Sequence, residues 1–201
     1  KNLEEGKYDN PYMTDYSGAG AIFATTGGVM EAALRTVYYV LNGKELDSIK
    51  IEQLRGFENA RTATVDIGGG IGEVKIAMCH GLKEARQITE QVLAGEGDYD
   101  FIEIMACPGG CVDGGGHLRS KKKYKPHAMK RRDTLYKIDT NAKVRQSHNN
   151  PQIQALYKDF LGKPHSEKAH HLLHTHYTNR KSDYQQTMKD IWEDVIETFA
   201  R

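Results

Sequence analysis

Two cysteines four positions apart, in a loop built largely of glycine, constrain this chain more than any other feature of its sequence. Cys107 and Cys111 lie within the stretch Met105-Ala-Cys-Pro-Gly-Gly-Cys-Val-Asp-Gly-Gly-Gly116. Thiolates are the preferred ligands of iron–sulfur clusters. Glycine permits positive φ angles and lets the backbone approach a cofactor closely. The stretch therefore predicts a loop that holds a bulky metal–sulfur group.

Two other interpretations of this loop remain open on the residues alone. Paired thiolates also bind zinc, although zinc ribbons usually supply a second cysteine pair. The only other cysteine, Cys79, follows an apolar strand pattern and is predicted to be a buried packing thiol. The second alternative is a glycine-rich loop that carries two inert thiols. We favour the iron–sulfur interpretation over both.

Composition indicates one ordinary domain with an uneven charge. The chain has 201 residues, 38% of them hydrophobic, and its mean hydropathy of −0.66 is polar for a self-contained core. Residues 1–117 carry 10 Lys and Arg against 18 Asp and Glu, whereas residues 118–201 carry 18 against 9. An acidic half followed by a basic, apolar-poor half predicts two parts that pack together or clasp a further partner.

The chain shows no sign of a membrane span, a signal region or a disulfide framework. No apolar run approaches the roughly 20 residues that cross a bilayer, and three cysteines suit a reducing compartment. We therefore expect a cytoplasmic location. Because the chain begins with Lys1 instead of Met, we also expect it to be part of something longer. The lysine-rich connector 118–132 lacks interleaved aromatic residues apart from Tyr124, so we expect no nucleic-acid partner, with docking of an acidic electron carrier as a weaker alternative.

Hydrophobic periodicity predicts an α/β layer. The expected elements are a small-residue loop over 18–28, a helix over 29–42 stopped by Gly43, paired strands Thr62–Ile67 and Glu73–Cys79, a helix over 84–94 and a strand Tyr99–Ile104. The cysteine motif begins where the last strand ends, which is where open α/β sheets place ligands. Helical segments are also expected near 128–138, 151–161 and 184–200. The last carries an apolar stripe for contact with another subunit or with the body: Ile191, Trp192, Val195, Ile196 and Phe199.

Three further patterns suggest chemistry that we do not favour. The loop 18–28 lacks the last glycine of a dinucleotide fingerprint. The glycine-rich turn 68–72 looks like the phosphate hairpin of actin-like ATPases, but no second hairpin or adenosine motif accompanies it. We predict a tight turn between core strands instead. Five histidines between 165 and 176 suggest a metal site, yet only Glu167 lies close by, and spacing alone is weak support: His165, His170, His171, His174 and His176.

Three segments resemble [FeFe]-hydrogenases. Residues 101–116 match every fixed position of the family's third cluster-binding motif, FxExMACxGGCxxGGG. Residues 23–35 are similar to the family stretch FGATGGVMEAALR and depart from it at Ala24 and Thr25. Residues 150–164 and 168–177 resemble the small-subunit segment of iron hydrogenases. Together these segments identify the chain as similar to the C-terminal part of the family's catalytic domain.

This resemblance implies a cofactor and roles for particular residues. The family combines two protons and two electrons reversibly into dihydrogen at the H-cluster, a [4Fe–4S] cubane joined to a diiron unit with CO and cyanide ligands. By carry-over, Cys107 ligates the cubane and Cys111 bridges the cubane and the diiron unit. Met105 would project into the pocket, whose implied walls and glycine cage are Phe23, Val29, Gly109 and Gly110.

The resemblance also implies a domain arrangement and partners. We expect one α/β lobe of the two-lobed catalytic domain over 1–117, a mostly helical small-subunit-like segment over 118–180 and an amphipathic helix over 181–201. The family's other cysteine motifs, TSCCP and MPCxxK, are absent here, so the chain should be inactive without the preceding half of the domain. Ferredoxin or iron–sulfur and flavin subunits would supply electrons. The alternative is a hydrogenase-like iron–sulfur protein for cluster assembly or sensing, without hydrogen turnover.

Overall fold

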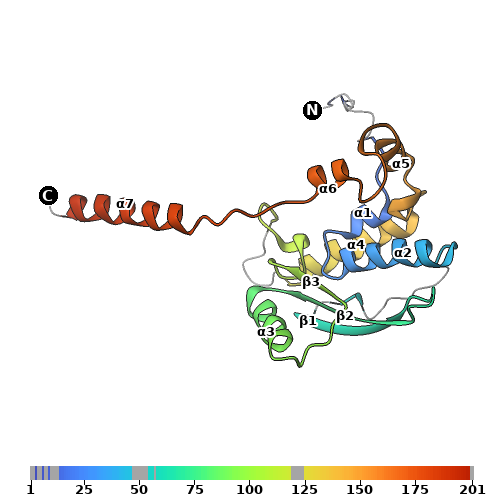
Figure 1. The fold of residues 1–201 in the computed structure, drawn as a ribbon, viewed down its shortest axis with the longest axis horizontal. Coiled ribbons are helices and arrows are strands. Elements are labelled where there is room, and N and C mark those ends of the chain that lie inside the picture. The colour runs from blue at the N-terminus through green and yellow to red at the C-terminus, as the bar shows by residue number, and fades with distance from the viewer. Residues whose placement is uncertain are drawn as a thin grey trace. The chain divides into compact units, whose positions relative to one another are not determined.

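The computed structural model describes residues 3, 6, 9, 14–46, 54–56, 58–118 and 125–199. It divides the chain into two compact units, Lys1–Leu156 and Tyr157–Arg201, which we describe separately (Figure 1). The division that we expected at residues 117 and 180 stays a prediction. Residues 119–124 of the lysine-rich connector lie outside the described residues, as do the side chain of Lys125 and those of the apolar stripe at 191–199.

A three-stranded mixed sheet forms the centre of the first unit. Its order is β1 (Ala60–Asp66), β2 (Glu73–His80), β3 (Phe101–Met105). Strands β1 and β2 are antiparallel, whereas β2 and β3 are parallel and are connected by helix α3 (Leu82–Leu93). The predicted strand–helix–strand layer is therefore confirmed, and β3 ends at the residue where the cysteine motif starts.

The turn between β1 and β2 is a glycine hairpin fastened to a helix end. Gly68 and Gly69 both have positive φ angles. The Asn42 side chain donates to the Ile67 carbonyl at 2.9 Å and accepts from the Gly69 amide at 3.0 Å. A Cβ on Gly69 would lie 2.5 Å from the Cβ of Leu41. The glycines therefore serve a close contact within the fold, as the tight-turn interpretation predicts.

Helices cover both faces of the sheet (Figure 1). Helix α2 (Gly28–Asn42) covers one face through a buried apolar cluster: Met30, Leu34, Leu54, Ile67, Ile76 and Met78. Helix α3 covers the other face with Ile88 against Ala77 and Cys79, so the predicted burial of Cys79 is confirmed. Helix α2 ends at Gly43, whose φ is 65° and whose amide donates to the Tyr39 carbonyl, also as predicted.

The apolar face of α2 is wider than the part that the sheet covers. Val37 lies close to Met30 and Leu41 around the helix, yet it is 40% exposed. Met30, Leu34 and Leu41 pack on the sheet, whereas Val29, Ala33 and Val37 follow one another at steps of four residues along the edge of this face. One edge of the apolar face of α2 is therefore left partly uncovered.

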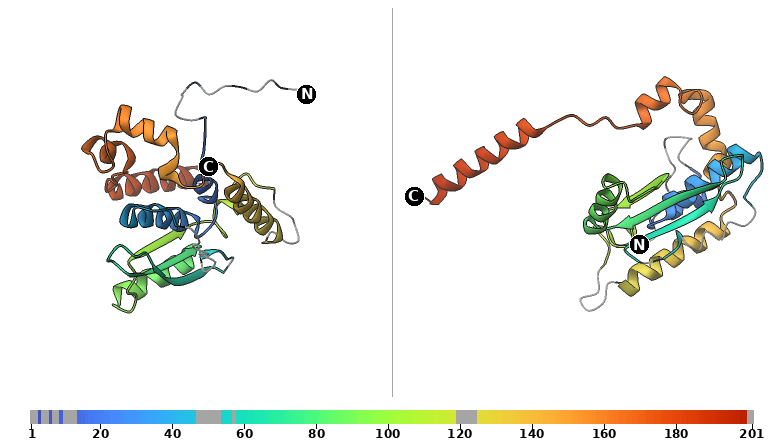
Figure 2. Two further views of the ribbon diagram at one scale, coloured as in Figure 1. Left: turned by 90° about the vertical axis from the view of Figure 1, so that its right-hand side faces the viewer. Right: turned by 60° about the horizontal axis from the view of Figure 1, so that its bottom comes forward.

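The loop expected over 18–28 begins with a short helix, α1 (Gly18–Ile22). The Ser17 side chain caps it by accepting from the Gly20 amide at 3.2 Å, and Ala19 and Ile22 are fully buried. Helix α1 packs against α4 (Lys125–Asn141), which extends beyond the predicted 128–138 at both ends. Figure 2 shows α4 running beside α1.

A buried ion network joins α4 to α2. The Arg35 guanidinium donates to both carboxylate oxygens of Asp139 at 2.8 Å and to Glu31 at 2.5 Å. Arg145 also donates to Asp139 at 2.8 Å, and Arg55 donates to Glu31 at 2.6 Å. Asp139 is fully buried and Glu31 is 1% exposed. A buried carboxylate needs such partners because desolvation penalises its charge.

The helices after α4 match the expected ones only in part. Helix α5 (Pro151–Leu156) continues as a π-helical turn, Tyr157–Leu161, over the predicted 151–161 segment. In the second unit, α6 (Glu167–Leu173) was not predicted, and Ser166 caps it by accepting from the Ala169 amide at 3.1 Å. Helix α7 (Lys181–Phe199) replaces the expected 184–200. Within the described residues, none of these helices has the length and apolar character that a membrane crossing requires.

Candidate metal centre

The two cysteines lie in the loop that follows β3. Cys107 is half-buried, Cys111 is exposed at the start of a short 3-10 turn (Cys111–Asp113), and both thiols are free. The loop closes on itself because the Gly110 amide donates to the Cys107 carbonyl at 2.9 Å. It also follows β3 at the carboxyl end of the parallel pair, the position where α/β sheets hold ligands.

A second loop, residues 23–27, lies directly against the cysteine loop. The Thr26 amide donates to the Gly109 carbonyl at 3.0 Å, and the Val112 amide donates to the Ala24 carbonyl at 3.1 Å. These two backbone hydrogen bonds bring together segments that are more than 80 residues apart in the sequence. The structure therefore places the two family-like motifs at one junction.

Met105 and Gly110 meet at this junction. A Cβ on Gly110, whose φ is 96°, would lie 2.7 Å from the Ala24 carbonyl oxygen, 2.9 Å from the Thr26 nitrogen and 3.0 Å from the Met105 sulfur. Glycine is thus required both by its φ and by the closeness of the second loop. Gly109 is buried beside it with a φ of 73°.

We expect Gly110→Ala to separate the two loops. The added methyl group has no space against two backbone atoms, and alanine also disfavours this φ, which together cost about 2 kcal/mol or more. Urea unfolding measures this loss. Gly115→Ala is the matched control, because a Cβ at Gly115 meets nothing within 4 Å. Equal stability of the two variants would contradict the proposed closeness of the loops.

The other predicted pocket residues lie on the second loop and the helix that follows it. Phe23 is 45% exposed, while Val29 in the first turn of α2 and Met105 at the end of β3 are half-buried. Apolar side chains thus reach the surface on or next to the segments that this junction brings together. Contact of these residues with a cluster, and the separate roles of Cys107 and Cys111, stay predictions.

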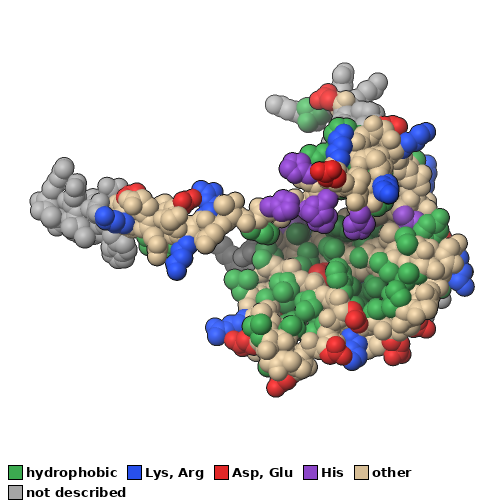
Figure 3. Space-filling model, viewed as in Figure 1, with side chains coloured by type: hydrophobic (Ala, Val, Ile, Leu, Met, Phe, Trp, Pro, Cys, Tyr) green, Lys and Arg blue, Asp and Glu red, His purple; other side chains and the backbone are tan. Residues whose placement is uncertain are grey.

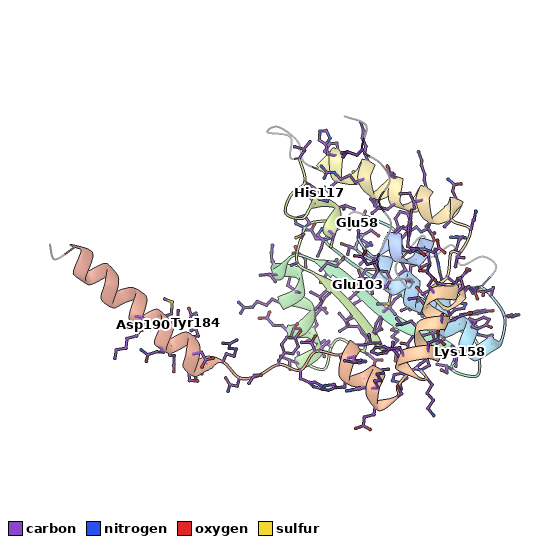
Figure 4. All side chains as sticks on the ribbon, turned by 90° about the horizontal axis from the view of Figure 1, so that it is seen from above. Glu58, Glu103, His117, Lys158, Tyr184 and Asp190 are labelled. Atoms are coloured by element: carbon purple, nitrogen blue, oxygen red, sulfur yellow. The ribbon has the colours of Figure 1, made fainter. Side chains whose placement is uncertain are left out.

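Sequence reasoning missed the buried polar side chains behind the junction. Glu103, in the interior of the first unit (Figure 4), accepts from the Gly27 amide at 2.5 Å and from the Met30 amide at 2.7 Å. Burial raises the pKa of Glu103, which these amides and Arg61 partly oppose. Arg61 donates to the carbonyls of Thr26 and Leu54 at 3.1 and 2.8 Å. The one sequence signal for the buried role of Glu103 was its place between apolar neighbours in a predicted strand.

His80 binds the side-chain hydroxyl of Thr26. The Thr26 hydroxyl lies 3.1 Å from His80 Nδ1, and His80 Nε2 lies 3.2 Å from the Asn59 side-chain oxygen. The Asn59 amide nitrogen donates to the Glu84 carboxylate at 3.0 Å, so the Asn59 oxygen must face His80. A neutral His80 therefore carries its proton on Nε2 and accepts from Thr26. The amide, carbonyl and hydroxyl of Thr26 are all hydrogen-bonded.

The ligands at this junction suit a thiolate-bound cluster, but they could hold it from one side only. The junction provides two free thiols, a glycine backbone that approaches closely and apolar neighbours, which are the features that iron–sulfur ligation needs. Across the described part of the chain, no group of three His, Cys, Asp or Glu side chains is placed to hold a metal ion. His170 and His174 stack on each other with ring centroids 4.5 Å apart. A complete cluster site would need further ligands.

An α/β lobe with a paired-thiol loop at the end of a parallel strand is the kind of unit that carries part of a metal–sulfur centre. The sequence profile described as iron only hydrogenase large subunit, C-terminal domain, matches residues 1–115, and that of the iron hydrogenase small subunit matches residues 125–180. The chain belongs to the iron-only hydrogenase family, as its C-terminal large-subunit part followed by a small-subunit segment.

Individual relatives agree with this assignment. The NADP-reducing hydrogenase subunit HndD of Solidesulfovibrio fructosivorans is 45% identical over 89% of this chain, which spans 30% of that relative. The solved [FeFe]-hydrogenase HydA1 from Chlamydomonas reinhardtii is 39% identical with a TM-score of 0.64, over 88% of this chain and 50% of that one. The cytosolic iron-sulfur assembly component 3 of Rattus norvegicus is 26% identical over 82% of this chain and 32% of its own length.

Proposed function

We propose that this chain is the C-terminal half of an [FeFe]-hydrogenase catalytic domain and supplies two thiolates to its H-cluster. The observation that carries the proposal is the junction of two family motifs, joined by backbone hydrogen bonds, with Cys107 and Cys111 free beside it. The family membership of the chain supports the same conclusion. Since the chain covers half of the solved relative, activity requires the remaining half.

The residues of this chain would prepare the site in three ways. Cys107 and Cys111 would hold the cluster through their thiolates, Cys107 at its [4Fe–4S] part and Cys111 where that part meets the diiron unit. When bound, the H-cluster supplies the reversible reduction of protons to dihydrogen. Phe23, Val29 and Met105 would exclude water from one side, because these apolar side chains lie on or next to the segments that backbone hydrogen bonds join to the thiol loop. The hydrogen bonds of Thr26 keep this wall rigid.

We further propose that the remaining half of the domain covers the exposed edge of the apolar face of α2. Val29, Ala33, Val37 and Val40 lie along this edge at helical spacing, and Val40 is 72% exposed. Figure 3 shows hydrophobic side chains gathered over this part of the first unit. A helix whose apolar face extends beyond the sheet that it packs on is typical of a larger core. Ferredoxin or iron–sulfur and flavin subunits would then supply electrons in a reducing, cytoplasmic setting.

Joint production with the missing half tests the proposal. The chain is produced anaerobically, in a host that assembles H-clusters, with a domain half that carries the TSCCP and MPCxxK motifs. We expect hydrogen evolution and infrared bands of bound CO and cyanide from the assembly, and neither from this chain alone. Hydrogen evolution by the isolated chain, or an iron-loaded assembly without these bands, would refute the proposal.

A second candidate is an iron–sulfur protein for cluster assembly. The relative named as a cytosolic iron-sulfur assembly component supports it, at lower identity than the hydrogenase subunit. The apolar residues around the thiols favour hydrogen turnover, because a protein that holds only a cubane has less need of them. Iron–sulfur absorption without CO and cyanide bands, in the same assembly, would identify this second function.

A further inference from the structure

Helix α2 starts without a cap from its own segment. The first amides of a helix have no partner within the helix, and Ser, Thr, Asp or Asn at the preceding position usually binds one of them. Here that position is Gly27, with a φ of 90° and no side chain. A Cβ there would lie 2.2 Å from the Leu54 carbonyl oxygen, so no capping residue fits. The Gly28 amide donates to the Thr25 carbonyl at 2.9 Å, so the partner of the other amides must come from another element.

Glu103 on β3 provides that partner. Its two carboxylate oxygens accept separately, one from the Gly27 amide at 2.5 Å and the other from the Met30 amide at 2.7 Å. The side chain is buried, with the residue 7% exposed. A carboxylate is favoured here because the helix dipole places partial positive charge at this end. Hydrogen bonds to a charged acceptor are also stronger than neutral ones.

The position of Glu103 couples this cap to the candidate metal centre. Glu103 lies two residues before Met105 and four before Cys107 on the same strand and loop, while the amides that it binds flank Val29. We infer that Glu103 is a positioning residue that fixes the distance between the cysteine loop and the apolar wall on α2. The meaning of that distance for a cluster rests on the proposed function, whereas the cap itself does not.

Two substitutions separate the charge from the shape of this side chain. Glu103→Gln keeps the length but offers one oxygen, and its NH₂ group faces an amide that also donates. Glu103→Asp keeps the charge but is one methylene shorter. Glu73→Gln is the matched control, since Glu73 is an exposed glutamate at the start of β2.

Residue-level amide exchange in the isolated chain tests the cap without any cluster. In Glu103→Gln we expect the Gly27 and Met30 amides to exchange at least about tenfold faster, because their hydrogen bond to a charged acceptor is lost. The Thr26 amide, which donates to the Gly109 carbonyl, should exchange faster as well, because its loop loosens with the start of α2. The amides of the β1–β2 ladder, such as those of Ala63 and Ile76, should keep their rates. Unchanged rates at Gly27 and Met30, or an equal acceleration of all amides, would overturn the inference. If the Gln variant does not fold, the Asp variant is measured in its place.

The assembled protein gives a second readout. At equal iron content, we expect Glu103→Gln to shift the CO and cyanide infrared bands, and the Glu73→Gln control to leave them in place. Unshifted bands in Glu103→Gln would overturn the link between the cap and the site. A different outcome would separate the two proposals. If Glu103→Gln changes the local amide exchange but the unsubstituted assembly shows no bands, the proposed function is refuted and the cap is established.

Discussion

Cys111→Ser is expected to remove the CO and cyanide bands from the assembled protein, and Cys107→Ser to lower its iron content by at least the four iron atoms of the cubane proposed there. Serine has a similar shape, but its hydroxyl does not ionise like a thiol and is a poor ligand for iron–sulfur clusters. Both thiols are free, and both belong to the loop that the second motif segment contacts. Infrared spectroscopy and iron analysis of the anaerobic assembly measure the two effects.

Cys79→Ala is the control within the same chain. Cys79 is fully buried against Ala77 and Ile88, and burial raises the pKa of its thiol, so it stays protonated and does not act as a ligand. We expect unchanged iron and bands, with a stability loss of about 1 kcal/mol from the small cavity. Loss of iron in Cys79→Ala, or full bands in Cys111→Ser, would show that the cluster is held differently.

The elements that could be predicted from the sequence are those governed by local patterns. Alternating apolar residues predicted β1 and β2, and the glycines between them predicted the turn. Gly43 marked the end of α2, and the cysteine motif did follow a strand. The position of the two thiols in a glycine loop after a strand was also predictable, because the thiols and their glycines are adjacent in the chain.

The parts that could not be predicted depend on contacts between distant residues. Glu103 binds amides 76 and 73 positions away, and Asp139 binds Arg35 at a distance of 104 positions. No local pattern indicates such partners. Helix α1 was missed because small residues usually favour a loop, although Ser17 caps it and α4 buries it. The exposure of Val37 could not be predicted because periodicity alone does not tell how much of an apolar face meets the sheet.

Asp139→Asn is expected to destabilise the first unit by about 3–5 kcal/mol, the usual cost of removing one partner from a buried ion pair. The substitution leaves Arg35 buried beside a neutral amide that cannot replace both carboxylate hydrogen bonds. Urea unfolding measures the change. Asp133→Asn on the same helix is the control, because Asp133 is exposed and pairs with its neighbour Arg132, and it should change stability by about 0.5 kcal/mol or less.

The same pair predicts how this loss depends on pH. Burial alone would raise the pKa of Asp139, but hydrogen bonds from Arg35 and Arg145 and their charges hold it below its usual value. The carboxylate therefore adds stability that is fully present above the unfolded pKa of about 3.9. This contribution disappears as the pH falls through the lower pKa of the folded state. The difference in the free energy of unfolding between the native chain and Asp139→Asn should therefore be roughly constant from about pH 5 to 8 and should shrink in acid.

Loss of Asp139 should also reach the candidate metal centre. On α4, one turn before Asp139, the Tyr136 hydroxyl lies 3.2 Å from the Thr25 hydroxyl, in the loop beside the cysteines. The Arg55 guanidinium lies over the Tyr136 ring at 4.3 Å and also binds Glu31. If α4 shifts, Thr25 loses this contact, and the Thr26 amide should exchange faster in Asp139→Asn than in Asp133→Asn. Equal exchange in the two variants would mean that the ion network stabilises the unit without positioning the loop.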